Sequence, residues 1–303
     1  MGLGCIALVD IQKGSLILNE NSKMCADIKE VDGSSKWIKS LLKSFNQMSK
    51  ADQLEFMALH DKCSNFQDYQ NSEDFQNCKE IVDKSLECLK LEIGKIEHDP
   101  QKTKEIFKIC NIYLSNSFRA TSDGVGNGVR IKTSRFNHSC QPNAVQLHKT
   151  IRLYEVRAIA NIKSGQEITL NWCSDPFFGF KSKVHRQNSL LNAPPFVLCS
   201  CVLCEGDDDI DATAFEALIQ EAEELASGWK SLENCRKEVQ CYKKMYTVGR
   251  TQKIQPYFLY YKILKQAFMI ASHGYLMYQA NDLKMEVKSL MEAMEKFGKV
   301  FGK

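Results

Sequence analysis

The stretch "RFNHSCQPNA", residues 135–144, brings an imidazole, a thiol, amide side chains and a proline together within ten positions. Taken alone, Asn137 would be expected to satisfy its own loop, and His138 to be a hydrogen-bonded core histidine. Pro142 and Asn143 are typical turn formers. The function of the stretch therefore depends on what the rest of the chain supplies.

Composition limits the class of protein. The chain has 303 residues, of which 44% are hydrophobic and 25% charged, and these values are typical of one large or two ordinary globular domains. The net charge of +3 is too small to indicate direct nucleic-acid binding, although a charged peptide partner remains compatible with it. The chain shows neither a signal peptide nor a membrane-spanning stretch, so we expect an intracellular protein of the cytoplasm or nucleus.

Hydrophobic periodicity predicts a sheet that a helical insert interrupts. Alternating apolar residues from Ile6 to Leu18 predict two short strands around the turn "DIQKG". Helical spacing follows from Ser34 to Leu59 and again from Phe75 to Ile93, and Asp99 with Pro100 begins a third helix toward Tyr113. Strand patterns return in "AVQLHKT", "IRLYEVRAIANI" and "QEITLNW" (residues 144–172), with "KSG" as a turn.

The C-terminal third is predicted to be helical. It follows the acidic linker "EGDDDIDA" (residues 205–212) and ends in paired helices of a repeat type. The aromatic side chains of residues 257–278 recur at helical spacing, which favours a core over a peptide-binding face.

Clustered cysteines indicate a metal site. The chain has 13 cysteines, and in a reducing compartment these are not expected to form disulfides. "CSCVLC" presents Cys199, Cys201 and Cys204 from one loop, and tetrahedral zinc requires a fourth ligand from elsewhere. Cys140, His138 and Cys173 are the candidates. Three incidental cysteines are the alternative, but the polar linker that follows argues against it.

Several motifs, taken in order, resemble the SET-domain methyltransferases and, within them, the SET and MYND family. The combination covers about 200 residues and is more specific than any single motif. The matching segments are "GLGCIA" (2–7), "DIQKG" (10–14), "NSF" (116–118), "RFNHSCQPNA" (135–144), "RAIANIKSGQEITLNW" (157–172) and "CSCVLC" (199–204).

The resemblance implies an α+β SET domain of small twisted β-sheets with a pseudoknot, a helical insert, a post-SET zinc loop and a tetratricopeptide-like helical tail. The corresponding division of the chain is residues 1–30 and 116–178 for the two parts of the SET domain, 31–115 for the insert, 179–208 for the post-SET zinc region and 209–303 for the helical domain.

The resemblance also implies an activity, which is transfer of a methyl group from S-adenosyl-L-methionine to a lysine side chain of a protein or peptide substrate. Glycines permit close backbone approach to such a cofactor, and amide or imidazole groups can hold its polar end. The implied cofactor residues are Gly2, Leu3, Gly4, Asn116, Asn137 and His138. The implied zinc ligands are Cys140, Cys199, Cys201 and Cys204.

Two substitutions depart from the family pattern. Trp172 and Pro195 occupy the positions of the family's lysine-channel tyrosines. Tryptophan can line a channel and attract an ammonium group, but its N–H cannot accept a hydrogen bond from the amine. Tyr154 or Tyr113 could supply a hydroxyl instead.

The substitutions motivate a second hypothesis, a SET-fold pseudoenzyme that binds a protein partner. A third hypothesis, a purely structural zinc protein, is disfavoured because such a protein would not need the glycine, asparagine and histidine positions together.

The zinc-binding MYND finger of the family is missing from this sequence. The finger normally lies between the first strands and the helices, where residues 20–35 contain only Cys25. We therefore interpret the chain as a relative without the finger, or as one that has lost sequence before Met1, and carry over no partner contact that depends on it.

Overall fold

The computed structural model describes much of the chain, including the four candidate zinc ligands and four of the six candidate cofactor residues, Gly4, Asn116, Asn137 and His138. The described residues are 4–26, 35–59, 100–119, 127–148, 153–173, 178–191, 198–205, 212–227, 231–251 and 288. Gly2, Leu3, Pro195, the predicted helix over residues 75–93 and the aromatic segment 257–278 lie outside these ranges.

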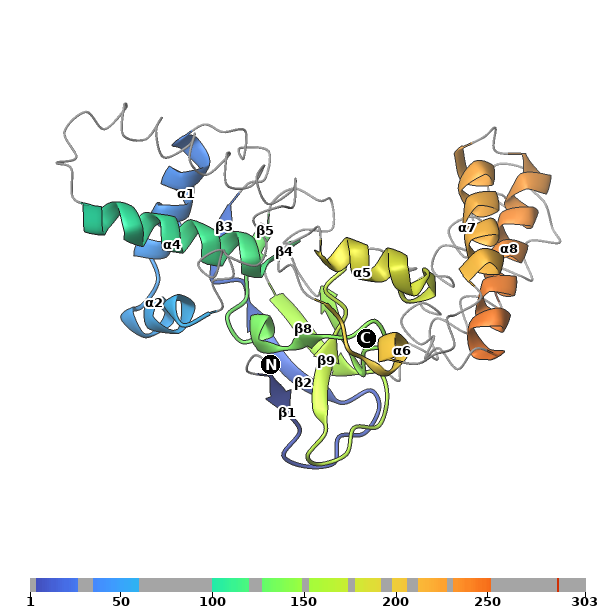
Figure 1. Ribbon diagram of the computed structural model, residues 1–303, viewed down its shortest axis with the longest axis horizontal. Coiled ribbons are helices and arrows are strands. Elements are labelled where there is room, and N and C mark those ends of the chain that lie inside the picture. Colours follow the sequence, from blue (N-terminus) through green and yellow to red (C-terminus); the bar gives the residue numbers. More distant parts are fainter. Residues whose placement is uncertain are drawn as a thin grey trace.

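Three small sheets form the centre of the fold, and each has three strands. This mixture of small sheets and helices is the predicted α+β class (Figure 1). The first sheet has the order β1 (Cys5–Ile6), β9 (Glu167–Leu170), β6 (Asn137–His138); the second β2 (Leu16–Asn21), β8 (Leu153–Ala158), β7 (Ala144–His148); the third β3 (Met24–Ala26), β5 (Asn127–Val129), β4 (Ser117–Arg119).

Strand β9 joins three distant parts of the sequence. β1 pairs with it antiparallel through Cys5 and Ile168, and β6 pairs with it parallel through Asn137 and Thr169. The backbone N–H of Ser139 then donates to the carbonyl of Leu170 at 2.9 Å. The "NHS" segment is thus held along one edge of β9, while the N-terminal strand β1 pairs with its other edge.

The turn before β9 has the predicted chemistry. Gly165 has φ +84°, a left-handed conformation that glycine adopts without a Cβ penalty. The backbone N–H of Gln166 donates to the carbonyl of Lys163 at 3.0 Å and closes the turn. Its position confirms the "KSG" prediction and fixes where β9 begins.

The described part of the insert contains α1 (Ser35–Asn46), α2 (Lys50–Met57) and α4 (Pro100–Asn116). The helical segment predicted over Ser34–Leu59 is divided into α1 and α2, because Ser49 caps a new helix, and α4 confirms the helix predicted from Pro100. Pro100 is the first residue of α4, where its missing N–H costs no hydrogen bond. Apolar residues of α1 and α4 bury a core against β3 and β5. These core residues include Trp37, Ile38, Leu41, Phe45, Ile109, Ile112 and Tyr113.

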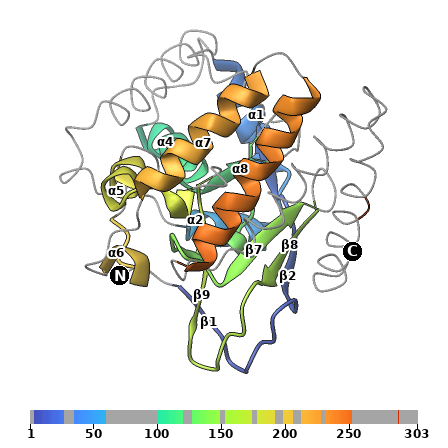
Figure 2. The same ribbon diagram turned by 90° about the vertical axis from the view of Figure 1, so that its right-hand side faces the viewer.

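Two helices of the C-terminal region are described, α7 (Ala212–Ser227) and α8 (Leu232–Thr251), and they pack side by side (Figure 2). The ring of Phe215 on α7 lies 4.3 Å from that of Phe180 in the 3-10 turn η4 (Phe178–Phe180), so an aromatic pair joins this helix pair to the sheet region. The predicted tetratricopeptide-like arrangement stays a prediction.

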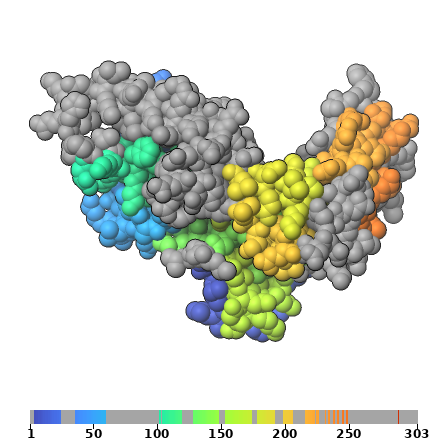
Figure 3. Space-filling model, viewed as in Figure 1, coloured from blue at the N-terminus to red at the C-terminus, as the bar shows by residue number. Residues whose placement is uncertain are grey.

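In the sequence between η4 and α7 lie two further helices, α5 (Lys183–Leu191) and the short α6 (Val202–Glu205). In Figure 3 these segments form the surface directly above the strands of residues 153–170. Ser182 caps α5, since its hydroxyl accepts the N–H of His185 at 3.2 Å. Arg186 and Leu190, one helical turn apart, are the buried residues of α5 and face the cysteines at positions 140, 199 and 204.

One buried carboxylate holds the segment that leads into "NHSC". Glu20 of β2 is 8% exposed and accepts the backbone N–H groups of Lys132 and Thr133 at 2.9 and 2.8 Å. The hydroxyl of Thr133 donates to the same carboxylate at 2.7 Å. Glu20 therefore fastens the 3-10 turn η3 (Thr133–Arg135), immediately before Asn137, to the second sheet.

We expect Glu20→Ala to lower the free energy of unfolding by about 2–4 kcal/mol, because it leaves a buried backbone donor, a partly buried one and a buried hydroxyl without their acceptor. Urea denaturation followed by circular dichroism measures the change. Thr133→Val is the matched control, because it removes only the hydroxyl bond and should cost less than Glu20→Ala. Equal stability of Glu20→Ala and the wild type would contradict this role.

Candidate metal centre and cofactor site

Four cysteine sulfurs form a compact cluster. The Sγ atoms of Cys140, Cys199, Cys201 and Cys204 all lie within 4.8 Å of one another. Three come from the loop around α6, and Cys140 comes from the end of the "NHSC" segment. Cys173 packs against this cluster but does not belong to the group of four, so among the sequence candidates Cys140 is the thiol brought to the other three.

The geometry of the four sulfurs fits a tetrahedral zinc ion. A Zn–S bond of about 2.3 Å implies S–S separations of about 3.8 Å. The Sγ atoms of Cys140 and Cys204 are 3.6 Å apart, far longer than a disulfide, and all four cysteines are free thiols. Four thiolates without an open position are typical of a structural zinc site and not of a catalytic one.

The four thiols share protons, so the pKa values of Cys201 and Cys204 are lowered while those of Cys140 and Cys199 are raised. Hydrogen bonding from Cys140 lowers the pKa of Cys204 to about 7 and also lowers the pKa of Cys201. Hydrogen bonding with Cys199 raises the pKa of Cys140, because the proton retained on one sulfur stabilises the charge on another. A divalent ion would replace these shared protons, since metal binding requires deprotonated ligands.

We expect about one zinc per chain, and we expect Cys140→Ser to lose it and unfold at lower urea concentration, since structural zinc binding contributes folding free energy. Elemental analysis of the purified variant measures the zinc content. Cys173→Ser is the control, because this neighbouring thiol lies outside the group of four and its loss should leave the zinc in place. Full zinc retention in Cys140→Ser would refute the fourth ligand.

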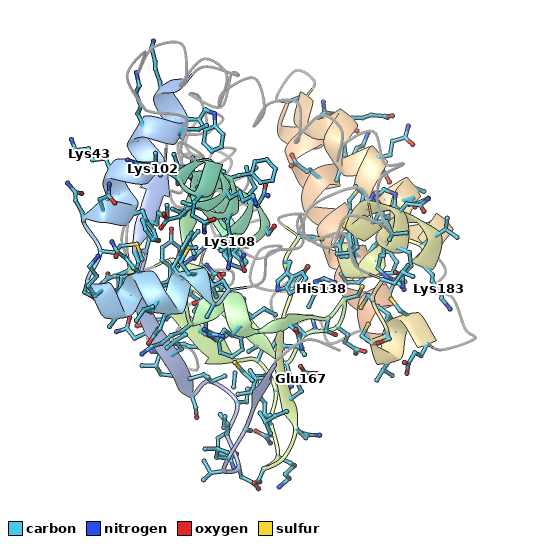
Figure 4. All side chains as sticks on the ribbon, turned by 60° about the vertical axis from the view of Figure 1, so that its left-hand side comes forward. Lys43, Lys102, Lys108, His138, Glu167 and Lys183 are labelled. Atoms are coloured by element: carbon cyan, nitrogen blue, oxygen red, sulfur yellow. The ribbon has the colours of Figure 1, made fainter. Side chains whose placement is uncertain are left out.

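The ring of His138 is held between the cysteines and Trp172. Its Nδ1 accepts the backbone N–H of Trp172 at 3.1 Å, and its Nε2 lies 3.5 Å from the Sγ of Cys140. Because Nδ1 is an acceptor, a neutral ring carries its proton on Nε2 and donates it to the sulfur. Burial lowers the pKa of His138 to about 4, so the ring is neutral at neutral pH. Figure 4 shows His138 between the strands and α5.

Trp172 is fixed at two atoms. Besides the backbone bond to His138, its indole Nε1–H donates to the carbonyl of Phe136 at 3.0 Å. The rings of Trp172 and His138 have centroids 5.6 Å apart. Trp172 therefore presents ring atoms and not its N–H. Tyr113 packs in the core of the insert, and the ring of Tyr154 lies against the guanidinium of Arg130 at 3.7 Å.

Three positions at the first sheet, Gly4, Asn137 and Glu167, converge in space. Gly4 precedes β1, Asn137 opens β6 and Glu167 opens β9. The Nδ2 of Asn137 donates to Oε1 of Glu167 at 2.6 Å. A Cβ at Gly4 would lie 2.7 Å from the Asn137 amide nitrogen and would also collide with the Glu167 carboxylate. A larger residue at position 4 would displace the ends of these two side chains, so glycine keeps the present arrangement of Asn137 and Glu167.

Asn116 lies at the end of α4 and is 8% exposed. Its side-chain Nδ2 donates to the backbone carbonyl of Ile112 at 2.8 Å. Its backbone carbonyl accepts the hydroxyl of Ser134 at 3.2 Å. Asn116 thus lies against η3, close in sequence to Asn137. Its side-chain contact is within its own helix.

The comparison with protein families decides the identity of this fold. The family model described as SET domain matches residues 2–173, which is more than half of the chain and includes the converging strands and Cys140. The chain belongs to the SET domain family. The SET fold accounts for three small sheets whose strands come from both sides of a helical insert in the sequence, and for "NHSC" beside β9. It also confirms the family predicted from the ordered motifs.

Two curated relatives carry the same domain name. SET domain-containing protein L678 of Acanthamoeba polyphaga mimivirus is 25% identical over 217 residues, which are 69% of this chain and 76% of that protein. A SET and MYND domain-containing protein of Dictyostelium discoideum is 26% identical over 146 residues, which are 44% of this chain but only 25% of that protein.

Solved structures of one enzyme were also found. Rubisco LSMT bound to AdoMet has a TM-score of 0.41 and 16% identity, covering 99% of this chain and 85% of that one. The SET domain of LSMT bound to lysine and AdoHcy has a TM-score of 0.41 and 15% identity, covering 99% and 84%.

The roles of two charged side chains near the candidate sites, Glu167 and Arg186, were not predicted from the sequence. Glu167 lies in the quoted motif "RAIANIKSGQEITLNW", but nothing in the strand pattern connects it to Asn137, thirty residues earlier. Arg186 is 0% exposed beside the cysteines, although its sequence context "KVHRQN" is polar and typical of a surface helix. Only the fold reveals these neighbours.

In the part of the chain that the structure describes, no helix is both long and apolar enough to cross a membrane. The expected location in the cytoplasm or nucleus stays a prediction.

Proposed function

We propose that this chain binds S-adenosylmethionine and transfers its methyl group to a lysine side chain of a protein. Membership of the SET domain family supports the reaction class. The convergence of Gly4, Asn137 and Glu167 is the observation that supports a cofactor site in this chain. Gly2 and Leu3, outside the described residues, continue the proposed site.

The three positions suit a zwitterionic ligand. The bare backbone at Gly4 permits close approach, and Glu167 offers a carboxylate to an ammonium or sulfonium group. The hydrogen bond to Glu167 fixes the Asn137 amide, so that its Oδ1 points away from the carboxylate as an acceptor. Because both ring nitrogens of His138 are engaged, any contact of His138 with the cofactor would use its main chain or ring face.

The cofactor, when bound, supplies an electrophilic methyl group on a sulfonium. The chain's own residues need only align the neutral lysine amine with it in line and exclude water. Trp172 is held rigidly enough for this purpose by His138 and Phe136, and its ring can attract the lysine ammonium before the proton is lost. A phenol hydroxyl at this position would assist orientation without forming a covalent bond, so its replacement is compatible with activity.

Titration calorimetry with S-adenosylmethionine tests the first half of the proposal without a known substrate. We expect micromolar binding to the zinc-loaded protein, equivalent to about −8 kcal/mol. Asn137→Ala should weaken it by about 10-fold to 100-fold, because it removes a hydrogen bond to a charged group. Asn21→Ala, at an exposed residue of β2, is the matched control and should bind as the wild type does. Absence of binding in the wild type would contradict the proposal.

Methyl transfer tests the second half. The wild-type chain, incubated with cellular protein and cofactor labelled on the methyl group, should produce labelled methyllysine after acid hydrolysis. Trp172→Ala should reduce the rate while cofactor affinity is retained, because the proposed channel wall is lost and the residues at Gly4 and Asn137 are not. Label on arginine or histidine, or wild-type binding without transfer, would contradict lysine methylation.

A further inference from the structure

Arg186 is a buried cation beside the cysteines. It is 0% exposed and lies on the inner face of α5. Its Nη2 donates to the carbonyl of Leu203 at 3.1 Å and lies 3.7 Å from the Sγ of Cys204. Its Nη1 donates to the carbonyl of Lys181. The guanidinium thus joins both ends of the segment 181–204 and contacts one sulfur of the metal centre.

This charge requires compensation. A guanidinium does not lose its proton in proteins, and a buried charge is costly unless an opposite charge lies beside it. Among the residues that the structure describes, no carboxylate forms an ion pair with Arg186. Two carbonyls and a cysteine sulfur are its recorded hydrogen-bond partners. Within the described part of the chain, the sulfur cluster is the group beside Arg186 that can carry negative charge.

A metal centre of four cysteines supplies that charge. Its ligands are thiolates, so a divalent ion held by four of them retains a net negative charge. We propose that Arg186 is the charge partner of this centre: it donates to the Cys204 thiolate, stabilises the buried negative charge of the four thiolates and thereby strengthens metal retention. His138 donates to the Cys140 sulfur from the opposite segment, so that two of the four sulfurs receive N–H groups.

The inference goes beyond methyl transfer and does not depend on it, since it rests on the metal centre. Partners of this kind commonly change metal affinity when they are removed. Their hydrogen bonds to sulfur also tune the electronic properties of metal–thiolate centres. An arginine that merely tethered the loop through backbone carbonyls would affect stability but not the electronic state of the sulfurs.

Gln187 is a matched control for that difference. Its Nε2 donates to the carbonyl of Cys199 at 2.7 Å, and its Oε1 accepts the N–H of Cys199 at 3.0 Å. It therefore tethers the same cysteine loop from the same helix, next to Arg186 in sequence, through two backbone hydrogen bonds. None of its recorded hydrogen bonds reaches a sulfur atom.

The experiment compares Arg186→Met, Arg186→Lys and Gln187→Met with the wild type in the full chain. Zinc affinity is measured by competition with a chelator. The sulfur-to-metal charge-transfer absorption is measured after replacing zinc with cobalt(II).

We expect Arg186→Met to bind zinc about 10-fold to 100-fold more weakly and to shift the charge-transfer band to lower energy, because the thiolates lose a positive neighbour. Arg186→Lys should lie between Arg186→Met and the wild type. Gln187→Met should lower the melting temperature and leave the band unchanged.

Unchanged zinc affinity and band position in Arg186→Met would overturn the proposal, as would an equal shift of the band in Gln187→Met. Should Arg186→Met fail to fold, Arg186→Lys decides: a partial shift of the band supports the charge partner, and a band at the wild-type position overturns it. A wild-type chain that binds no zinc would overturn both this proposal and the metal centre. The proposed methyl transfer is tested separately, by the cofactor-binding and methylation assays.

Discussion

The four-sulfur contact between Cys140 and the loop of Cys199, Cys201 and Cys204 is the constraint on which the rest of the site depends. Cys140 ends the segment whose first residues pair with β9, so the sulfur centre fixes a strand as well as a loop. The ring of His138 contacts the Sγ of Cys140 and accepts the backbone N–H of Trp172, so it links the sulfur centre to the backbone at Trp172. The candidate metal centre, the proposed cofactor site and the proposed lysine channel are thus connected parts of one structure.

Much of the fold could be predicted from the sequence because its signals are local. Helical spacing around Trp37 and the proline at position 100 define helices of the insert, and "KSG" defines the turn before β9. The C-x-C-x-x-C spacing identified a metal loop without any knowledge of the fold. It could not choose its fourth ligand, because Cys140, His138 and Cys173 were all chemically suitable. The choice depends on parallel pairing between β6 and β9, a contact across about thirty residues that periodicity does not encode.

The side chains that sequence reasoning missed are charged groups whose roles depend on burial or on a partner. Glu20, Glu167 and Arg186 each occupy a sequence context that would suit an exposed residue. In the structure, Glu20 accepts three donors, Glu167 orients Asn137, and Arg186 faces the sulfurs. His138 was assigned to the cofactor by resemblance, and the structure places its ring nitrogens on Cys140 and Trp172 instead of leaving them open. A residue's neighbours across the fold decide such roles.

The most direct test of the central claim is hydrogen exchange, measured with mass spectrometry, before and after a chelator removes the metal. The account predicts that the amides of Ser139 and Trp172, which bond to Leu170 and His138, lose protection when the metal is lost. The amides of α1 and α4, whose core packs around Trp37 and Ile112, should retain it. Unchanged protection at Ser139 and Trp172 after complete metal removal would contradict the claim that the sulfur centre holds the site together.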